Sequence, residues 1–327
     1  SDLDQNYFDG LVDEVSYFSS ALSSTDIETI YNNGVPNNLN ELSTLPTIWY
    51  RMGEEATFDG SNWTLTDQGS GGNNATTQNM AEASRVLDVP PTFNTKSILL
   101  DGIDDAVVIG TASLGITSTI SVSAWVKIPT TNTGGGGTNI QVIIAEDTTG
   151  SGQRNWNLFW RGGGIDSFYF AIHNTNLSSS SAQSVGVTPN SGQWIHILAT
   201  YDGTANANGI KLYIDGVPNA QGTASSTGIN SFTSSEPNIG RLTGQNQWNF
   251  EGNIDEVSVW NSELSASDVT SIYNSGVPNN LNDLSTPPLS WWRCGDGDTS
   301  PTLTDNGSGG NDGTMTNFST FSTDVPT

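Results

Sequence analysis

The chain has 327 residues, a length that fits two domains of average size or one large all-β domain. With 34% hydrophobic residues and 36 glycines it is apolar enough to bury a core, which excludes disorder along the whole chain. Its 34 acidic residues outnumber its 9 basic residues, and the net charge of −25 argues against nucleic acid and anionic membranes as direct partners.

The sequence carries neither a disulfide framework nor a membrane span. Its single cysteine, Cys294, cannot form an intrachain disulfide, and we interpret it as a small apolar residue in a strand. No run of about 18 apolar residues occurs, so we expect no membrane insertion.

In chain order, the first predicted element is a short helix that begins near residue 25. Thr25 and Glu28 have the spacing of a capping box, in which each side chain satisfies a free backbone amide of the first turn. Gly34 and then Pro36 end the helix. The same pattern returns with Ser267, Gly276 and Pro278, which predicts a second short, peripheral helix.

Most of the remaining elements are predicted strands. Residues 120–128 alternate strictly, with apolar residues on one face and Ser, Trp and Lys on the other, as in a half-buried strand. Similar runs occupy residues 140–145, 155–160, 168–173, 194–201, 210–214 and 253–260. Asp-Gly pairs at 101–102, 202–203 and 215–216 are typical of tight turns. Many short strands without interleaved helices predict an antiparallel sandwich or barrel.

An internal repeat relates the two ends of the chain. When the sequence is shifted by 242 residues, positions 7–53 match positions 249–295 at 27 of 47 places. Residues 65–73 then match 303–311 after a length change of four residues. A long fixed period of this kind is the mark of an array of modules.

Prolines near residues 46 and 288 suggest where one module ends and the next begins. We therefore predict that residues 46–286 form a complete module. Residues 1–45 would be the C-terminal part of a preceding module, and residues 287–327 the N-terminal part of a following one. The chain would then be one part of a longer array of modules.

Several motifs follow one another in the order of a known family. They occupy residues 49–53, 65–73, 100–109, 193–203, 211–216 and 252–258. The third reads Leu-Asp-Gly-Ile-Asp-Asp-Ala-Val-Val-Ile, with Ala106 where an aromatic residue is usual. In this order the motifs resemble laminin-G-like domains of the concanavalin A-like lectin/glucanase superfamily.

The resemblance implies an all-β fold, a two-sheet antiparallel jelly-roll sandwich with one short peripheral helix per module. It often includes a structural calcium ion, which Asp101, Asp104, Asp105 and Asp255 would bind here. Asp-Gly turns and solvated acids explain the same residues without an ion. The resemblance also implies a carbohydrate-binding or adhesive role, but it implies no particular ligand.

The sequence argues against an enzyme. Glucanases need two carboxylates at a fixed separation, whereas Asp255 and Glu256 are neighbours and point to opposite faces of a strand. His173 and His196 each lie within a strand pattern, and no motif supplies a nucleophile beside them.

The predicted glycan site uses the loops at residues 129–139, 146–155 and 241–249, which are rich in Gly, Asn and Gln. The candidate residues are Trp248, Arg241, Gln247 and Trp156. Alternatively, the two tryptophans fill the core of the sandwich. We therefore predict a non-catalytic, extracellular protein of a cell or virion surface, an adhesin or fibre whose modules contact adjacent copies and bind a glycan or polysaccharide. The alternative is a structural protein whose modules pack head to tail without a glycan.

Overall fold

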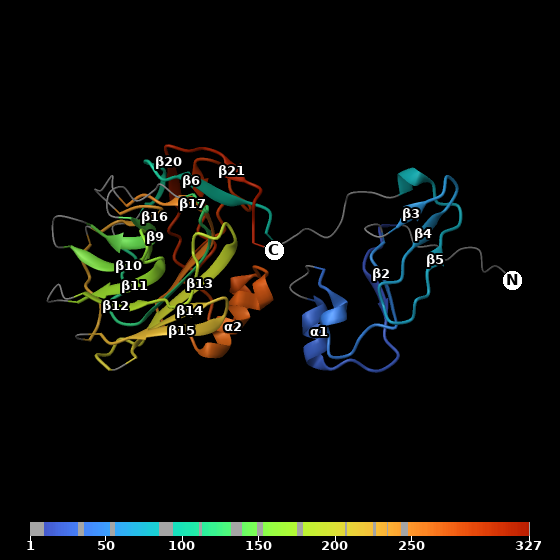
Figure 1. Ribbon diagram of the computed structural model, residues 1–327, viewed down its shortest axis with the longest axis horizontal. Coiled ribbons are helices and arrows are strands. Elements are labelled where there is room, and N and C mark those ends of the chain that lie inside the picture. The colour runs from blue at the N-terminus through green and yellow to red at the C-terminus, as the bar shows by residue number, and fades with distance from the viewer. Residues whose placement is uncertain are drawn as a thin grey trace. The chain divides into compact units, whose positions relative to one another are not determined.

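The computed structural model describes residues 10–31, 36–52, 56–84, 94–110, 113–131, 139–148, 153–174, 179–206, 208–224, 227–233, 235–242 and 248–326. The chain divides into two compact units, Ser1–Phe93 and Asn94–Thr327, which we call unit 1 and unit 2 (Figure 1).

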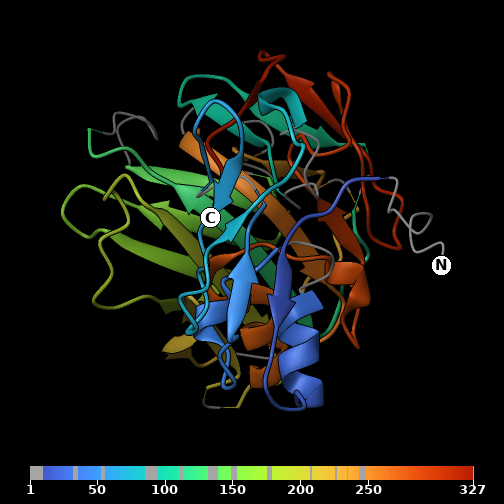
Figure 2. The ribbon, with the colours of Figure 1, turned by 90° about the vertical axis from the view of Figure 1, so that its right-hand side faces the viewer.

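Unit 1 is small and built around one short strand pair. Strands β1 (Val15–Tyr17) and β2 (Ile48–Tyr50) pair antiparallel (Figure 2). Val15 lies opposite Tyr50. Helix α1 (Ser24–Tyr31) and the 3-10 turn η2 (Leu39–Glu41) connect them. A second sheet contains β3 (Thr57–Phe58), β4 (Trp63–Leu65) and β5 (Ala75–Thr76), and the turn η3 (Glu82–Ser84) follows. Among the described residues of this unit, Leu39, Leu42 and Trp49 form a cluster of buried apolar residues.

Both predicted helices are present, but their caps lie two residues before the predicted ones. The Ser23 hydroxyl accepts from the Asp26 amide in α1, and Ser265 and Asp268 form a complete capping box at α2 (Ala266–Tyr273). Each helix contains eight residues, and no helix in the described part of the chain has the length and apolar character to span a membrane. The error arose because a Ser-x-x-Asp pattern caps a helix as well as Thr-x-x-Glu does.

Unit 2 consists of two eight-stranded antiparallel sheets. The first, which we call the β10 sheet, has the order β12 (Ser179–Gln183), β11 (Ser167–His173), β10 (Arg154–Arg161), β9 (Ile140–Asp147), β16 (Pro237–Ile239), β7 (Ala106–Ile109), β20 (Gly313–Thr316) and β19 (Thr302–Leu303).

The second, the β13 sheet, has the order β15 (Val217–Gly222), β14 (Ile210–Ile214), β13 (Trp194–Tyr201), β8 (Ile120–Lys127), β17 (Glu251–Trp260), β6 (Ser97–Asp101) and β21 (Phe321–Ser322). Strand β18 (Ser290–Trp292) also pairs with β17. The turns η5 (Asn274–Gly276) and η6 (Leu281–Asp283) lie between α2 and β18.

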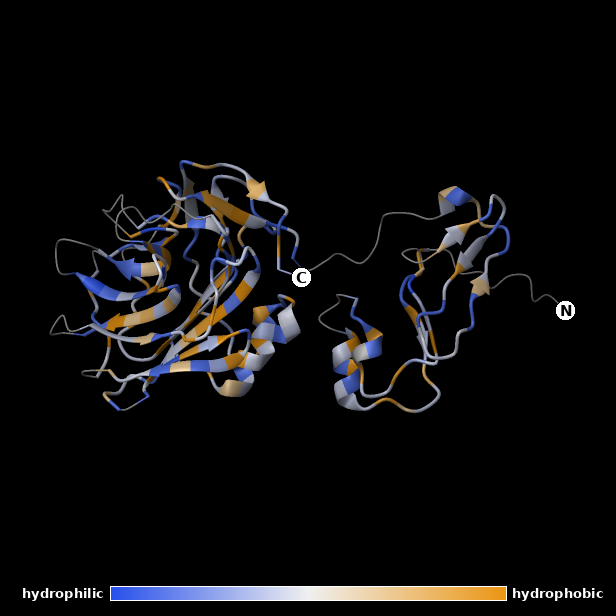
Figure 3. Cartoon of the chain, viewed as in Figure 1, coloured by the Kyte–Doolittle hydropathy of each residue, from blue (hydrophilic) through white to orange (hydrophobic). Residues whose placement is uncertain are grey.

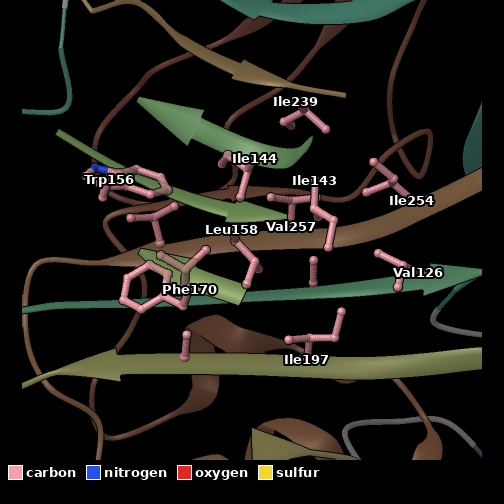
Figure 4. Close-up of a cluster of buried hydrophobic side chains, with 14 of the residues drawn as sticks. Val126, Ile143, Ile144, Trp156, Leu158, Phe170, Ile197, Ile239, Ile254 and Val257 are labelled. Carbon is pink, nitrogen blue, oxygen red and sulfur yellow. The ribbon is translucent and has the colours of Figure 1, made fainter. Parts of the chain in front are cut away.

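The two sheets bury one continuous core between them. Trp156, Leu158 and Phe170 of the β10 sheet and Val126 and Ile197 of the β13 sheet are essentially inaccessible to solvent (Figure 4). Apolar and polar residues alternate along several of the strands (Figure 3). The predicted fold class, an antiparallel two-sheet sandwich with one short helix, is confirmed for unit 2.

The compact units differ from the predicted modules. Strand β18 pairs with β17, β20 with β7, and β21 with β6, so residues 287–327 belong to the same sandwich as residues 94–286. Residues 46–93 belong instead to unit 1. The predicted boundaries at 45/46 and 286/287 therefore lie inside the two units, because the prolines used to set them occupy the connection between a closing strand and the strand that pairs with it.

Trp156 lies in the core, and its removal should destabilise unit 2. We expect Trp156→Ala to lower the free energy of unfolding by about 3–5 kcal/mol, because it leaves a large cavity in a close-packed interior. Denaturant unfolding followed by circular dichroism measures the change. The control is Val217→Ala, which removes a side chain that is 63% exposed and should change the free energy by no more than about 0.5 kcal/mol. Equal effects of the two substitutions would contradict this packing.

Candidate functional site

An aromatic pair lies on the outer face of the β10 sheet, the face turned away from the core. Trp156, Leu158 and Trp160 of β10 are buried in the core, so the alternation of the strand directs Asn157 and Phe159 outward. Phe159 is directly opposite Tyr169 of β11. Their rings are stacked, with centroids 5.0 Å apart and an interplanar angle of 4°. Both side chains are partly exposed, so together they present apolar carbon to solvent.

A third aromatic residue packs beside this pair. Val142, Ala145 and Leu242 form a small buried cluster, and both Phe159 and Trp248 pack against it. The Val142 amide donates to the Trp248 carbonyl at 3.0 Å, which attaches the segment around Trp248 to β9. Phe159, Tyr169 and Trp248 are therefore part of one apolar surface, which we call the aromatic face.

Polar side chains occupy the other end of the same sheet. Asp147 of β9 accepts hydrogen bonds from Asn157 Nδ2 at 2.6 Å and from Arg154 Nε at 3.0 Å. His173 Nε2 lies 3.8 Å from the Asp147 carboxylate, but burial, together with the nearby Arg154 charge, lowers the pKa of His173 to about 3, so the ring is neutral. Burial raises the pKa of Asp147, and the Arg154 contacts oppose that rise. These contacts fix the strands beside the aromatic face.

Amides and a cation border the aromatic face. Gln183 of β12 is opposite Tyr169, and its amide nitrogen is 3.3 Å from the Ser167 hydroxyl. Arg161 follows Phe159 by two residues on β10 and is exposed. The face therefore combines apolar rings with hydrogen-bonding groups, which is the composition of a site for a ligand with both apolar and polar surfaces.

Three aspartates gather in the turn between β6 and β7. One carboxylate oxygen from each of Asp101, Asp104 and Asp105 lies within 4.8 Å of the others. Asp101 Oδ1 accepts from the Ile103 amide, and Asp105 Oδ2 accepts from the Asp101 amide. Burial, followed by repulsion from the other two carboxylates, raises the pKa of Asp105. Three hard oxygens match part of the six to eight that calcium requires.

The acidic neighbours Asp255 and Glu256 are both buried in β17. Asp255 accepts from Asn94 Nδ2 at 2.8 Å and from the Glu256 amide at 2.9 Å. Glu256 accepts from Trp291 Nε1 at 2.5 Å and from Arg293 Nε at 3.3 Å. Burial raises the pKa of Glu256 to about 7 and the pKa of Asp255 well above its usual value. With 0% and 4% of their surfaces exposed, the two carboxyls connect β17 to its neighbours.

His196 is held in the interior of the β13 sheet. Its Nε2 is 2.8 Å from the Ser123 hydroxyl, and its ring packs against Trp125 and Tyr273. Complete burial lowers its pKa to about 3. His196 lies within a strand, as its sequence pattern predicted.

The sequence profile described as "Concanavalin A-like lectin/glucanases superfamily" matches residues 101–270, just over half of the chain. The chain belongs to this superfamily. The match covers β7 to β17 and most of α2, and it includes the aromatic face. No sequence among the curated proteins matches the chain.

Solved structures resemble this superfamily member in fold. A candidate carbohydrate-binding protein of Bacteroides ovatus covers 81% of this chain and 69% of its own, with 17% identity and a TM-score of 0.53. The CBM40 module of the Ruminococcus gnavus IT-sialidase, bound to α2,3 sialyllactose, covers 54% of this chain and 96% of its own, with 15% identity and a TM-score of 0.42.

The structure places the residues predicted for the glycan site in different environments. Trp156 is 0% exposed in the core, so its assignment as a sugar-stacking residue is wrong. Trp248 joins the aromatic face. Arg241 is half-buried just after β16, and Gln247 lies outside the described residues. Asp255, predicted as a calcium ligand, is not part of the group formed by the three turn aspartates, because it is buried against Asn94.

Phe159 and Tyr169 were missed as site residues. Both lie in segments predicted as strands, and each belongs to the alternate set that faces away from the core. The pattern within β10 and β11 therefore contained the signal. That pattern does not give the register between β10 and β11, which stacks the two rings.

The buried carboxyl of Glu256 predicts a pH-dependent stability. Its pKa is about 7 in the folded chain and ordinarily 4.5, so the folded state holds the proton more tightly. The stabilisation from that proton is complete below pH 4.5 and is lost as the pH rises through 7. We expect unit 2 to have a lower denaturation midpoint at pH 8 than at pH 5.5. Glu256→Gln should weaken this dependence, since the amide does not ionise. An equally steep dependence in the variant would contradict the assignment.

Proposed function

We propose that unit 2 is a non-catalytic carbohydrate-binding module that binds a glycan on the aromatic face. The stacked pair of Phe159 and Tyr169 is the observation on which this proposal depends. Sugars have apolar C–H faces that pack against aromatic rings, and hydroxyls that bond to amides such as Gln183. The superfamily membership and the carbohydrate-binding description of the Bacteroides ovatus structure support it.

The charge of the protein favours a neutral glycan or polysaccharide. A net charge of −25 repels polyanions over the distance at which a ligand first encounters the protein. The cations Arg161 and Arg241, near this sheet, then provide hydrogen-bond donors for sugar hydroxyls.

Binding without catalysis is supported by the positions of the acids. A glycosidase requires an acid and a second carboxylate on either side of an accessible bond. Asp255 and Glu256 are enclosed beneath β18 and the segment before β6, and the Asp147 carboxylate is also buried. We infer an extracellular role for such a module, as part of an adhesin or fibre on a cell or virion surface.

A glycan array identifies the ligand, and titration of the strongest binder then tests the site. We expect Tyr169→Ala to weaken binding about tenfold, because a lost aromatic contact is worth about 1 kcal/mol or slightly more. Phe159→Ala and Trp248→Ala should act in the same direction.

The control variant is Val217→Ala, on an exposed edge of the other sheet, and it should bind as the unchanged protein does. Melting temperatures of all variants establish that they are folded. Absence of binding to every glycan, or full affinity in all three aromatic variants, would overturn the proposal.

The three turn aspartates form the calcium site in this proposal. The ion would relieve the repulsion among Asp101, Asp104 and Asp105, and an ion bound to the folded state raises stability by mass action. We expect EDTA to lower the melting temperature of the protein and calcium to restore it. Asp104→Asn should reduce this response, whereas Asp283→Asn, at an exposed acid elsewhere, should leave it intact. A melting temperature that EDTA does not change would contradict calcium binding.

A second function, assembly with other modules, is favoured by the apolar residues that unit 1 exposes. Val12, Val15, Tyr17 and Ile27 are each between 40% and 59% exposed. Such a surface is typical of an interaction site.

A further inference from the structure

Unit 1 reproduces a part of unit 2 in detail. The two segments are the sequence repeats 8–53 and 250–295. In unit 1, Glu14 accepts from Trp49 Nε1 at 2.6 Å and from Arg51 Nε at 3.2 Å. The equivalent Glu256 accepts from Trp291 at 2.5 Å and from Arg293 at 3.3 Å. Unit 1 is therefore folded locally as the closing part of a sandwich.

The contact between the strand after the helix and a later loop is also reproduced. The Trp49 amide donates to Asp67 Oδ1 at 2.9 Å, and the equivalent Trp291 amide donates to Asp305 Oδ1 at 2.8 Å. The strand pair β1 and β2 has the register of β17 and β18, since Ser16 faces Trp49 as Ser258 faces Trp291. The repeat thus preserves the backbone as well as the side chains.

The two copies differ in what covers their apolar side. Val12, Val15 and Tyr17 are 51%, 40% and 59% exposed, whereas their equivalents Ile254, Val257 and Val259 are all 0% exposed. Ile27 of α1 is 56% exposed, and its equivalent Val269 of α2 is 0% exposed. In unit 2 these residues are buried against the rest of the sandwich.

Unit 2 shows which strands provide that cover and which strands pair with β17. One edge of β17 pairs with β8, and the other pairs with β6 through residues 251–254 and with β18 through residues 257–259. The apolar side of β17 packs in the core against the β10 sheet. In unit 1, β1 pairs with β2 along one edge, and no strand of the described residues pairs with its other edge. The open edge of β1 thus corresponds to the position of β8, and its exposed apolar side corresponds to the side that the β10 sheet covers. The position of β6 lies next to β2, on the same edge.

Two further residues of unit 1 match this missing contact. At Gly252 a Cβ atom would lie 2.2 Å from the Lys127 carbonyl of β8, so only glycine permits the strands to approach, and unit 1 has Gly10 in the equivalent place. Asp255 uses Oδ1 for the Glu256 amide and Oδ2 for Asn94, which precedes β6. Asp13 makes only the first of these bonds, with the Glu14 amide, among the described residues.

We propose that the open edge of β1 and its apolar side are a docking surface for a second sandwich of the same kind. The occupant is a module that lacks its own closing strand. Its equivalent of β8 pairs with the open edge, its equivalent of β6 lies beside β2, and its equivalent of the β10 sheet covers the apolar side. Unit 1 would complete that sandwich as β17, α2 and β18 complete unit 2. The proposal is independent of glycan binding, because it uses none of the residues of the aromatic face.

The test adds this occupant to the chain. A second copy of residues 94–249 is placed directly before residue 8, so that Phe8 follows Asn249 as Phe250 does in unit 2. Hydrogen exchange of peptides that cover residues 11–18 is then compared between the original and the extended chain. We expect exchange in these peptides to slow at least 100-fold, because β1 gains partners along its open edge.

Two variants of the extended chain serve as a matched pair. Val15→Asp places a charge in the proposed interface and should abolish the protection. Val217→Asp places the same charge at an exposed position and should leave the protection intact. In the folded extended chain, peptides from the two copies of residues 94–249 should exchange as one protected population.

Three results would overturn the proposal. The first is unchanged rapid exchange at residues 11–18, and the second is an unprotected population from the added copy. The third is protection of residues 11–18 in the original chain that disappears on dilution, which would identify a second copy of this chain as the occupant.

Discussion

The sandwich of unit 2 depends on the burial of one strand, β17. Nine of its ten residues are buried, and it pairs with β8 along one edge and with β6 and β18 along the other. It therefore joins the first strand of the unit to a strand near the end of the chain. Contacts between residues so distant in sequence close only when the intervening strands are in place. The acids Asp255 and Glu256 lie in this strand, and the cost of burying them is offset by hydrogen bonds from Asn94, Trp291 and Arg293.

The alternation of side chains predicted the fold, because a sandwich buries one face of each strand and strand residues alternate strictly. Residues 120–128 show the alternation most clearly, and β8 occupies residues 120–127 of this segment. Seven of its eight residues are buried, however, so the prediction of a half-buried strand is wrong for β8. The repeat of 242 residues predicted a modular chain but not where each unit starts. The length of a repeat does not show where a unit begins, so a cut at any position yields one complete copy of the repeat. The pairing of β18 with β17 sets that origin, and it is a long-range contact that no local proline signal contains.

The candidate site was predicted less well for a related reason. Tryptophans were chosen for their chemistry, but the side chain of Trp156 points into the core and Trp248 lies against β9. Whether an aromatic side chain of a strand is exposed to solvent depends on which face of the sheet it points to and on the neighbouring strands. Phe159 and Tyr169 form a surface only because β10 and β11 place them opposite one another. The three turn aspartates, which are close in sequence, lie together in the structure, whereas Asp255, far away in sequence, does not join them.

The two proposed surfaces belong to different units, the docking surface to unit 1 and the aromatic face to unit 2, and they correspond to different layers of a sandwich. Docking at a closing strand uses its edges and the inner side of its sheet, since β8 and β6 pair with the edges of β17 and the β10 sheet covers the inner side. The aromatic face lies on the outer side of the β10 sheet, the opposite layer of the sandwich. Completion of a sandwich by a neighbouring closing segment therefore leaves the outer side of the β10 sheet free. An array assembled through closing strands could thus present one glycan-binding face per module, and assembly and binding would not compete for the same residues.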